Sequence, residues 1–365
     1  MSKLIYKDHT ALEYAKMACD TMMKKFAPQD LPPKGHFHYH QGVFLSGVQK
    51  TYRLCREQKY FEYIKGWVDS IIDEKGEIHT FDPGELDDIQ PGILLYDLYH
   101  ETGDERYKTA LDTLLPLVLH FPRNPEGGFW HKEKNANEMW LDGLYMGGPI
   151  AAQYGAEFDK PEYFDTCIYQ ALMMERNTRD KKTGLLYHAF DFCRKQAWAD
   201  PVTGCSPEFW GRSIGWVPVA LLDEAEFIPQ DYPRRDALLA VAIDLLKAVV
   251  NYQDAESGLW YQVVDKGGQE GNWLESSCTC LFTAAICKAV RCGYLDESYL
   301  TYAEKGFKGI IDRLKYNENG VIIDNICIGT GVGDYAHYCN RPTSENDLHG
   351  AGAFILMCQE VEQSL

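Results

Sequence analysis

The sequence predicts an all-α protein, an (α/α)6 barrel of six inner and six outer helices that alternate along the chain. A Gly-containing tip followed by extended residues recurs, a turn leading into a Tyr-bearing helix start recurs between the tips, and two kinds of helix fit between these marks. The tips begin at Gly76, Gly128, Gly184, Gly258 and Gly320, and the helix starts carry Tyr60, Tyr107, Tyr163, Tyr232 and Tyr299.

One set of predicted helices is apolar on nearly every side and rich in glycine and alanine, as in residues 144–152. A helix without a polar face is buried, so we assign this set to the inner layer. The inner helices are expected at residues 40–54, 87–101, 139–156, 209–227, 273–294 and 346–361.

The second set is amphipathic with charged faces, which is typical of an outer layer. These helices are expected at residues 10–26, 61–73, 106–119, 162–176, 235–250 and 299–314. An open solenoid of helix pairs is the alternative architecture. We favour the closed barrel because neither end of the chain resembles the polar capping repeat that a solenoid requires.

The organisation indicates one domain spanning residues 1–365. This length exceeds the usual size of a domain, but no Pro/Ser-rich linker or charge block divides the chain, and the repeat runs from end to end. A hydrophobic content of 45% is ordinary and supports a large core.

Composition excludes several classes of partner. A net charge of −18 argues against nucleic acid, because phosphate binding needs a basic surface. No apolar run is long enough to span a membrane, and residues 1–8 lack the apolar core of a signal peptide. We expect a cytoplasmic protein, a monomer or weak homo-oligomer.

The 12 cysteines are scattered along predicted helices rather than spaced as a framework. In a reducing compartment such residues act as small buried hydrophobes. Cys278 and Cys280 are too close together for a zinc knuckle, so the cysteine pattern predicts no metal site.

A candidate site lies where the loops entering the inner helices converge. These loops are rich in polar and aromatic residues, and a regular repeat brings His131 and His188 to the same side. The aromatic content of 13% is high. It suggests a carbohydrate ligand, since sugars bind on aromatic faces, although aromatic residues also fill wide barrels. The loops cover residues 36–40, 85–88, 138–142 and 208–216.

Three acids and one arginine stand out among these residues. Asp142 lies in an apolar inner segment, as a helix cap or as a buried acid; apolar neighbours would raise its pKa, as a general acid requires. Asp87 and Asp88 indicate a pair in which one caps a helix and the other faces the mouth. Arg212, on the most apolar inner helix, needs an anionic partner, and we favour a substrate carboxylate over a protein one.

The basic residues of the tips carry less weight. A lone histidine at a turn is typical of a residue satisfied by the backbone, but His131 and His188 occupy the same repeat position, which favours function. Lys132 alone is typical of a solvated surface charge.

At these residues the chain resembles the unsaturated rhamnogalacturonyl hydrolases, and the likeness covers essentially the whole chain in order. The related unsaturated glucuronyl hydrolases share the barrel and the acid but differ around Trp-x-Arg. The motifs are Leu86-Asp87-Asp88-Ile89-x-Pro91-Gly92, Trp140-x-Asp142-Gly143-Leu144-Tyr145-Met146, Trp210-Gly211-Arg212-Ser213-x-Gly215-Trp216, Gly329-Thr330-x-Val332-Gly333-Asp334 and Asn346-Asp347-Leu348-His349-Gly350-x-Gly352-Ala353-Phe354.

The resemblance implies a small acidic oligosaccharide substrate, a disaccharide left by pectin lyases whose nonreducing uronic acid carries a C4=C5 double bond. Such enzymes hydrate this vinyl ether. Asp142 would protonate C4 and then, as a carboxylate, act as base toward the water that attacks C5. Asp88 would bind hydroxyls or water and keep Asp142 protonated by like-charge repulsion.

The remaining roles implied by the resemblance concern substrate binding, and no metal or organic cofactor is needed. Arg212, His188, His131 and Lys132 would bind the uronate and its hydroxyls. Tyr39, Trp210 and Trp216 would stack on the sugar or wall it in.

Three alternatives stay open at this point. A sugar 2-epimerase on the same barrel would use His131 and His188 for proton transfer. A sister hydrolase would act on unsaturated glucuronyl units of other polysaccharides. A non-catalytic carbohydrate-binding protein would have lost the acid, but Asp88 and Asp142 are both present.

Overall fold

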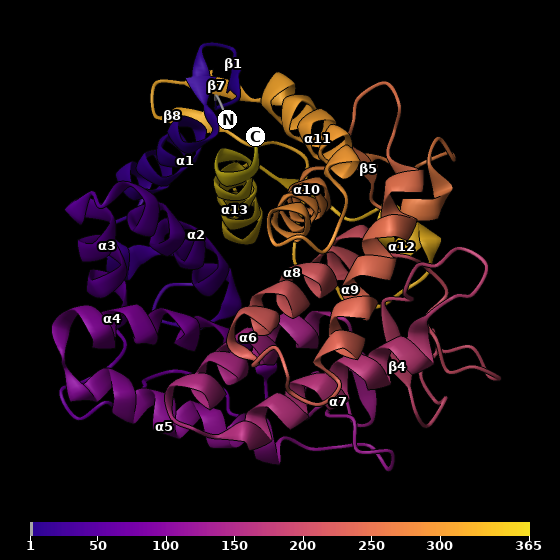
Figure 1. Ribbon diagram of the computed structural model, residues 1–365, viewed down its shortest axis with the longest axis horizontal. Helices are drawn as coiled ribbons and strands as arrows, with labels where there is room; N and C mark the ends of the chain where they lie inside the picture. Colours follow the sequence, from indigo (N-terminus) through magenta and orange to yellow (C-terminus); the bar gives the residue numbers. More distant parts are fainter. Residues whose placement is uncertain (1–2) are drawn as a thin grey trace.

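Twelve long helices between residues 3 and 365, the part of the chain that the computed structural model describes, form the predicted (α/α)6 barrel (Figure 1). The inner helices are α2 (Tyr39–Cys55), α4 (Leu94–Thr102), α6 (Asp142–Glu157), α8 (Gly211–Phe227), α10 (Ser276–Arg291) and α13 (Leu348–Ser364). The outer helices are α1 (Ala11–Lys25), α3 (Gln58–Asp69), α5 (Glu105–His120), α7 (Pro161–Thr178), α9 (Arg235–Val249) and α11 (Leu300–Arg313).

The ring is closed. The last inner helix, α13, packs against the first inner helix, α2, and also against its neighbours α10 and α1. An open solenoid would keep the first and last helices apart, so the barrel prediction is confirmed. None of the helices described here is long and apolar enough to cross a membrane.

Burial follows the two helix types. In α6, every residue from position 142 to position 155 is buried, whereas in α1 the buried side chains fall on one face, at Tyr14, Ala15, Ala18 and Met22. Spacings of three and four residues place these side chains on the same side of a helix. The inner helices can therefore pack on all sides, and the outer helices cover them.

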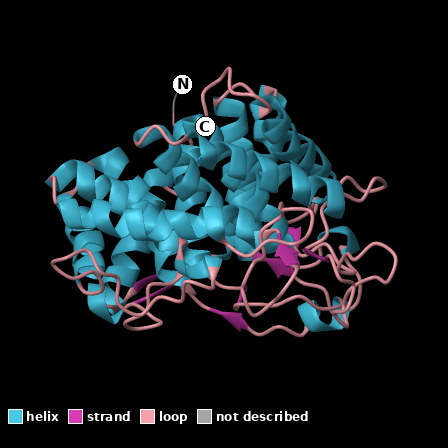
Figure 2. Ribbon diagram, turned by 90° about the horizontal axis from the view of Figure 1, so that it is seen from below, coloured by secondary structure: helices cyan, strands magenta, loops and turns pink. Residues whose placement is uncertain are grey.

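The strands that Figure 2 shows and most of the long loops lie at one end of the barrel, and the C-terminus lies at the other. Each strand pairs antiparallel with its neighbour in sequence. The strands are β1 (Ile5–Tyr6), β2 (His9–Thr10), β3 (Glu138–Trp140), β4 (Ala189–Asp191), β5 (Trp260–Tyr261), β6 (Leu274–Glu275), β7 (Lys315–Asn317), β8 (Gly320–Ile322), β9 (Ile326–Cys327) and β10 (Thr343–Ser344).

The repeated glycine tips turn the chain back from an outer helix toward the next inner one. Gly76, Gly184, Gly258 and Gly320 have positive φ, and at the remaining tip the positive φ falls on Gly127, just before Gly128. A side chain is strained in this conformation, which explains the recurring glycine.

The largest error in a predicted helix boundary is at the start of the second inner helix. The inner helix expected at residues 87–101 begins only at Leu94, after two 3₁₀ turns, η2 (Leu86–Asp88) and η3 (Gln90–Ile93). Pro91 has no N–H to donate into an α-helix, and a Cβ on Gly92 would lie 2.4 Å from Ile150 Cδ1. Elsewhere, short strands take the place of the predicted first helical turn, as β3 does before α6 and β6 before α10.

The remaining short helices lie between these elements. They are η1 (Pro28–Asp30), η4 (Val250–Tyr252), η5 (Val264–Lys266), η6 (Glu297–Tyr299) and α12 (Tyr335–Cys339).

Close packing of the inner helices gives a first prediction. A Cβ on Gly352 would lie 2.5 Å from the carbonyl oxygen of Val43 in α2, whereas a Cβ on Gly147 would meet no atom closer than 3.8 Å. We expect Gly352→Ala to destabilise the protein by about 1–3 kcal/mol through overpacking. Gly147→Ala, the matched control, should be neutral or stabilising by up to about 1 kcal/mol. Urea unfolding measures both, and equal effects would contradict the packing described.

Candidate active site

A cavity of about 360 Å³ opens among the first turns of the inner helices and the loops that lead into them. The helix starts aim polar and aromatic side chains at a common point, as predicted for the mouth of the barrel. The side chains and glycines around it are His38, Tyr39, His40, Asp87, His131, Lys132, Lys134, Asn135, Trp140, Asp142, Met146, Trp210, Arg212, Trp216, Gly329, Thr330 and Gly331.

Asp142, the first residue of α6, is held by a short two-stranded sheet. Trp140 in β3 pairs with Ala189 in β4, and the N–H of Leu141 donates to the carbonyl oxygen of His188 at 3.0 Å. This register brings His188 Nε2 to 3.1 Å from Asp142 Oδ2. The pairing of two successive tips therefore fixes the orientation of the candidate acid.

His188 does not face the cavity, so its predicted contact with substrate is not supported. The side chain is fully buried, and its ring lies between Trp140 and Trp210, with centroids 5.5 and 4.7 Å away. Its Nδ1 lies 2.7 Å from the hydroxyl of Tyr338, which itself accepts the N–H of Gly333 at 3.2 Å.

These contacts constrain the tautomer of His188. If Tyr338 donates its hydroxyl proton to Nδ1, the ring proton lies on Nε2 and points at the carboxylate of Asp142. The hydrogen bonds then form a series in which every donor points toward Asp142. Gly333 N–H donates to the Tyr338 hydroxyl, Tyr338 donates to His188 Nδ1, and His188 Nε2–H donates to the Asp142 carboxylate. His188 and Tyr338 thus position the acid from behind, away from the cavity.

The pKa of Asp142 differs from the sequence-based expectation. Burial alone would raise it, but the hydrogen bond from His188 and the positive potential of His188, His131 and Arg212 bring the pKa below its usual value. The prediction of a raised pKa was wrong for the free protein because it counted the apolar neighbours and missed the donors. Asp142 therefore stays a carboxylate unless a negative charge offsets the groups that lower its pKa.

Arg212 is the main positive group at the cavity. It is buried, and its two terminal nitrogens donate to the carbonyl oxygens of Cys327 and Ile328 at 2.5 and 2.8 Å. Its guanidinium lies over the ring of Trp210, 4.5 Å from the centroid. No carboxylate among residues 3–365 forms an ion pair with it, so the protein leaves this buried charge available for an anion.

A second charged group lies across the cavity. The carboxylate of Asp87 in η2 accepts from Lys132 Nζ at 2.6 Å and lies 3.6 Å from His131 Nε2. Although burial opposes ionisation, the neighbouring His131 and Lys132 lower the pKa of Asp87 to about 2. His131 stacks on Trp140 with centroids 4.5 Å apart, and burial lowers its pKa.

Asp88 occupies a different position from the one expected. It does not line the cavity: one carboxylate oxygen accepts the N–H of Asp82 at 2.7 Å, and the other is buried without a partner. Burial raises the pKa of Asp88 to about 7. The tight 3₁₀ turn at η2 sends consecutive side chains in different directions, so Asp87 takes the place at the cavity that the sequence analysis gave to Asp88.

Aromatic side chains form the walls. Tyr39, Trp210 and Trp216 all line the cavity as predicted, and Trp216 stacks on Tyr145 with centroids 4.4 Å apart. Trp140 adds a further wall, fixed by a 2.9 Å hydrogen bond from its indole nitrogen to Glu138. The cavity therefore combines flat apolar faces with a few charged groups, which suits a sugar acid.

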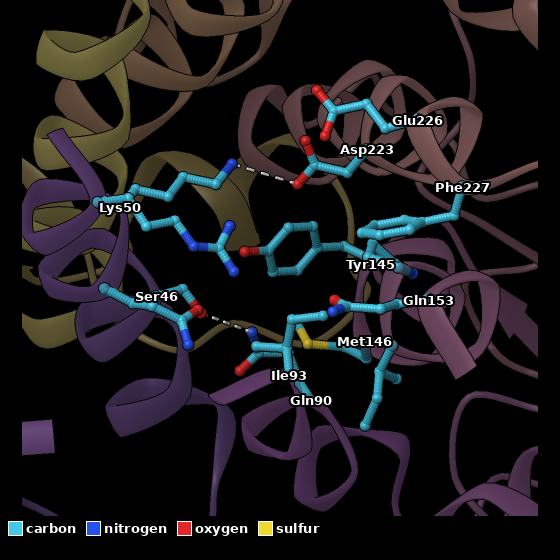
Figure 3. Close-up of a pocket in the computed structure, with 14 residues that line it drawn as sticks. Ser46, Lys50, Gln90, Ile93, Tyr145, Met146, Gln153, Asp223, Glu226 and Phe227 are labelled. Carbon is cyan, nitrogen blue, oxygen red and sulfur yellow. Dashed lines mark hydrogen bonds and ion pairs between the residues drawn. The ribbon is translucent and has the colours of Figure 1, made fainter. Parts of the chain in front are cut away.

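Met146 lines this cavity and also a second, smaller one, which Figure 3 shows. That second cavity holds about 50 Å³, room for little more than water. Its charges are paired, with Lys50 at 3.4 Å from Asp223, and Gln90 donates to Ser46 at 3.5 Å. These groups stabilise the barrel interior, and the larger cavity is the candidate substrate site.

Sequence reasoning singled out the pair of Asp87 and Asp88 but gave the place at the cavity to Asp88, and it missed several other residues of this site. Trp140 stands two residues before Asp142 in the same motif, so the signal was present. Thr330 also lies in a quoted motif. Tyr338 lies in the short helix α12, and nothing in the periodicity of the sequence marks it.

With this geometry in place, comparison with known proteins identifies the family. The model of Glycosyl Hydrolase Family 88 matches residues 14–365, so the chain belongs to this family and is a glycosidase. The unsaturated rhamnogalacturonyl hydrolase YesR of Bacillus subtilis is 26% identical over 297 residues, which cover 80% of this chain and 79% of YesR. These matches confirm the family to which the motifs pointed.

Solved structures agree on the fold. A glycoside hydrolase of family 105 from C. acetobutylicum superposes with a TM-score of 0.91 at 35% identity, covering 96% of this chain and 99% of that one. The unsaturated glucuronyl hydrolase of Bacillus sp. GL1 has a TM-score of 0.71 at 15% identity, covering 96% and 95% of the two chains, and shows the shared fold alone.

The two adjacent acids give a second prediction. Asp87→Asn should lower kcat/KM by at least about tenfold, since a charged hydrogen bond contributes about 1.5–3 kcal/mol. Asp88→Asn, the matched control, should leave kcat/KM nearly unchanged. Steady-state kinetics decides between them, and a larger loss in Asp88→Asn would restore the original assignment.

Tyr338 gives a third prediction. Tyr338→Phe keeps the ring but removes the hydroxyl that fixes the tautomer of His188, so kcat should fall by about tenfold or more while KM changes little. The pH dependence of kcat should shift as well, because Asp142 loses a fixed donor. An unchanged kcat and pH profile would show that the hydroxyl only fills space.

Proposed function

We propose that the protein hydrates the C4=C5 double bond of the nonreducing unsaturated galacturonic acid in disaccharides derived from rhamnogalacturonan, releasing rhamnose. The observation that carries the proposal is the buried guanidinium of Arg212, unpaired with any carboxylate of the described chain, on the same cavity as Asp142. Such a site fits the carboxylate of a uronate. The similarity to YesR supports the linked sugar.

The chemistry begins with a proton transfer from Asp142 to C4. The π electrons of C4=C5 form the new C4–H bond, and the positive charge at C5 is shared with the ring oxygen. Water then adds to C5 and gives its proton to the Asp142 carboxylate. The resulting hemiketal opens by breaking the bond between C5 and the ring oxygen, and the hemiacetal left at C1 expels the linked sugar.

One correctly placed acid is sufficient for this route. Displacement at the anomeric carbon would need two carboxylates flanking C1, whereas here the same group donates and later accepts a proton. Asp87, tied to Lys132, stays charged and accepts hydrogen bonds from sugar hydroxyls or from the attacking water. Tyr39, Trp140 and Trp216 enclose the ring.

Substrate binding causes Asp142 to take up from solvent the proton that it lacks in the free protein. The uronate carboxylate neutralises Arg212, one of the charges that lower the pKa of Asp142, and adds negative charge beside it. Both changes raise the pKa of Asp142. The acid is therefore protonated in the complex, where it is needed.

We also propose that residues 1–365 act as one catalytic domain in the cytoplasm. The cysteines are free thiols, most of them buried, which suits a reducing compartment.

The test is an assay in which the purified protein receives the unsaturated galacturonyl-rhamnose disaccharide in the presence of a chelator. Loss of the ultraviolet absorbance of the conjugated uronate, together with free rhamnose, is the expected result. Activity confined to an unsaturated glucuronyl disaccharide would reassign the substrate and keep the reaction. No loss of absorbance on either would contradict the proposal.

The two central side chains give a fourth prediction. Asp142→Asn should lower kcat by about 10²–10⁴-fold or more with binding preserved, because the variant cannot exchange the proton. Arg212→Ala should chiefly raise KM, by at least about tenfold, since it removes a charged hydrogen bond worth about 1.5–3 kcal/mol. Arg212→Lys is the matched control and should recover part of the binding.

A fifth prediction concerns protonation. Because the pKa of Asp142 lies below its usual value in the free protein and rises in the complex, binding of an unreactive saturated galacturonyl-rhamnose should take up a proton in mildly acidic buffer. Calorimetry in buffers of different ionisation enthalpy measures this uptake. It should vanish in Asp142→Asn, and equal uptake in that variant would assign the proton elsewhere.

A further inference from the structure

We propose that His40, Asp347 and His349 form a binding site for a divalent cation of the zinc type at the rim of the substrate cavity. One ligand atom from each of these residues lies within 4.8 Å of the other two. The set joins the first turn of α2 to the start of α13 and is separate from Asp142 and the residues that orient it.

The outer nitrogen of His349, the one that points away from the proposed site, already has a hydrogen-bond partner. Its Nε2 lies 3.0 Å from the carbonyl oxygen of Cys327, and because a carbonyl can only accept, the ring proton lies on Nε2. The inner nitrogen, Nδ1, is buried and faces Asp347 Oδ1 at 2.8 Å, with no other partner among residues 3–365. A neutral ring would thus direct a lone pair at a carboxylate, an arrangement that a cation between them would stabilise.

The outer nitrogen of His40 is fixed in a similar way. His38 Nδ1 accepts the backbone N–H of His40 at 3.4 Å, so it presents a lone pair. His40 Nδ1 lies 3.0 Å from the same atom and must donate its proton there. His40 Nε2 is therefore left with a lone pair, 3.9 Å from Asp347 Oδ1.

The chemistry of the three donors favours zinc. Each histidine donates its outer N–H to a neighbour and turns its inner nitrogen to the centre, the pattern that orients metal-bound imidazoles. Zinc binds imidazole and carboxylate at about 2.0–2.2 Å, which places tetrahedral ligands about 3.3 Å apart. Asp347 Oδ1 lies 2.8 Å from His349 Nδ1 and 3.9 Å from His40 Nε2, which bracket that value, and the two nitrogens lie within 4.8 Å of each other. Side-chain shifts can therefore bring the three atoms to the spacing that zinc requires.

The remaining features of Asp347 agree with this role. It precedes α13 but makes no side-chain cap to the helix, and its carboxylate accepts no hydrogen bond from elsewhere in residues 3–365. A third cavity of about 420 Å³, lined by His38, His40, Asn346 and Asp347, gives an ion a path from solvent. A bound cation would fix His40 in the cavity wall and, through the Cys327 carbonyl shared with Arg212, brace the uronate site.

The test is zinc titration of the intact, tag-free protein after chelator treatment, followed by competition with a chromophoric chelator. We expect one equivalent of Zn²⁺ to bind and raise the thermal midpoint, and Co²⁺ to give the visible absorption of a tetrahedral complex. His349→Gln, Asp347→Asn and His40→Gln should each weaken binding by at least about 100-fold, since loss of even an outer partner costs 10–100-fold.

The control is His100→Gln, which changes an exposed histidine paired with Glu157 on the outside of the barrel and should bind zinc like the wild type. Circular dichroism in chelator establishes that each variant folds, and His40→Gln serves if the buried His349 variant does not. Absence of stoichiometric binding by the wild type would overturn the proposal. Undiminished binding by the folded variants would also overturn it. The readouts are independent of catalysis.

Discussion

The buried guanidinium of Arg212 is held by two backbone carbonyls and a tryptophan face, and none of the described carboxylates neutralises it. Burying a charge of this kind costs free energy unless an opposite charge pairs with it. The site is therefore built around an anion that the substrate must bring. In the proposed function, that requirement selects a sugar acid, orients its carboxylate, and couples binding to the protonation of Asp142.

The barrel makes this arrangement possible by packing its inner helices with small and apolar residues and leaving the chemistry to their first turns. Short β pairs between successive tips set the fine geometry. The β3–β4 pair brings Asp142 to His188, and the bridge between Glu85 and Lys132 brings Asp87 to the opposite wall. Tyr338 reaches the site from a distant part of the sequence, so the acid is positioned by elements that meet only in the folded barrel.

The fold could be predicted because its signals are periodic: glycine tips recur where φ is positive, and the two helix types differ in polarity. The site could be predicted only where local sequence carries it, as for Asp142, Arg212 and the tryptophans. Whether Asp87 or Asp88 faces the cavity depends on backbone angles within one 3₁₀ turn, which composition does not reveal. The pKa of Asp142 depends on its distances from His188 and Arg212. These residues are far from Asp142 in the sequence and approach it only in the folded protein.

In the proposed mechanism Asp142 delivers a proton to C4 of the unsaturated sugar. Turnover in D₂O, quenched before the carbon beside the new ketone can exchange, tests this step by NMR of the first product. We expect one deuterium on a single face of C4, appearing at the same rate as free rhamnose. Rhamnose released with the double bond intact and no deuterium at C4 would contradict it.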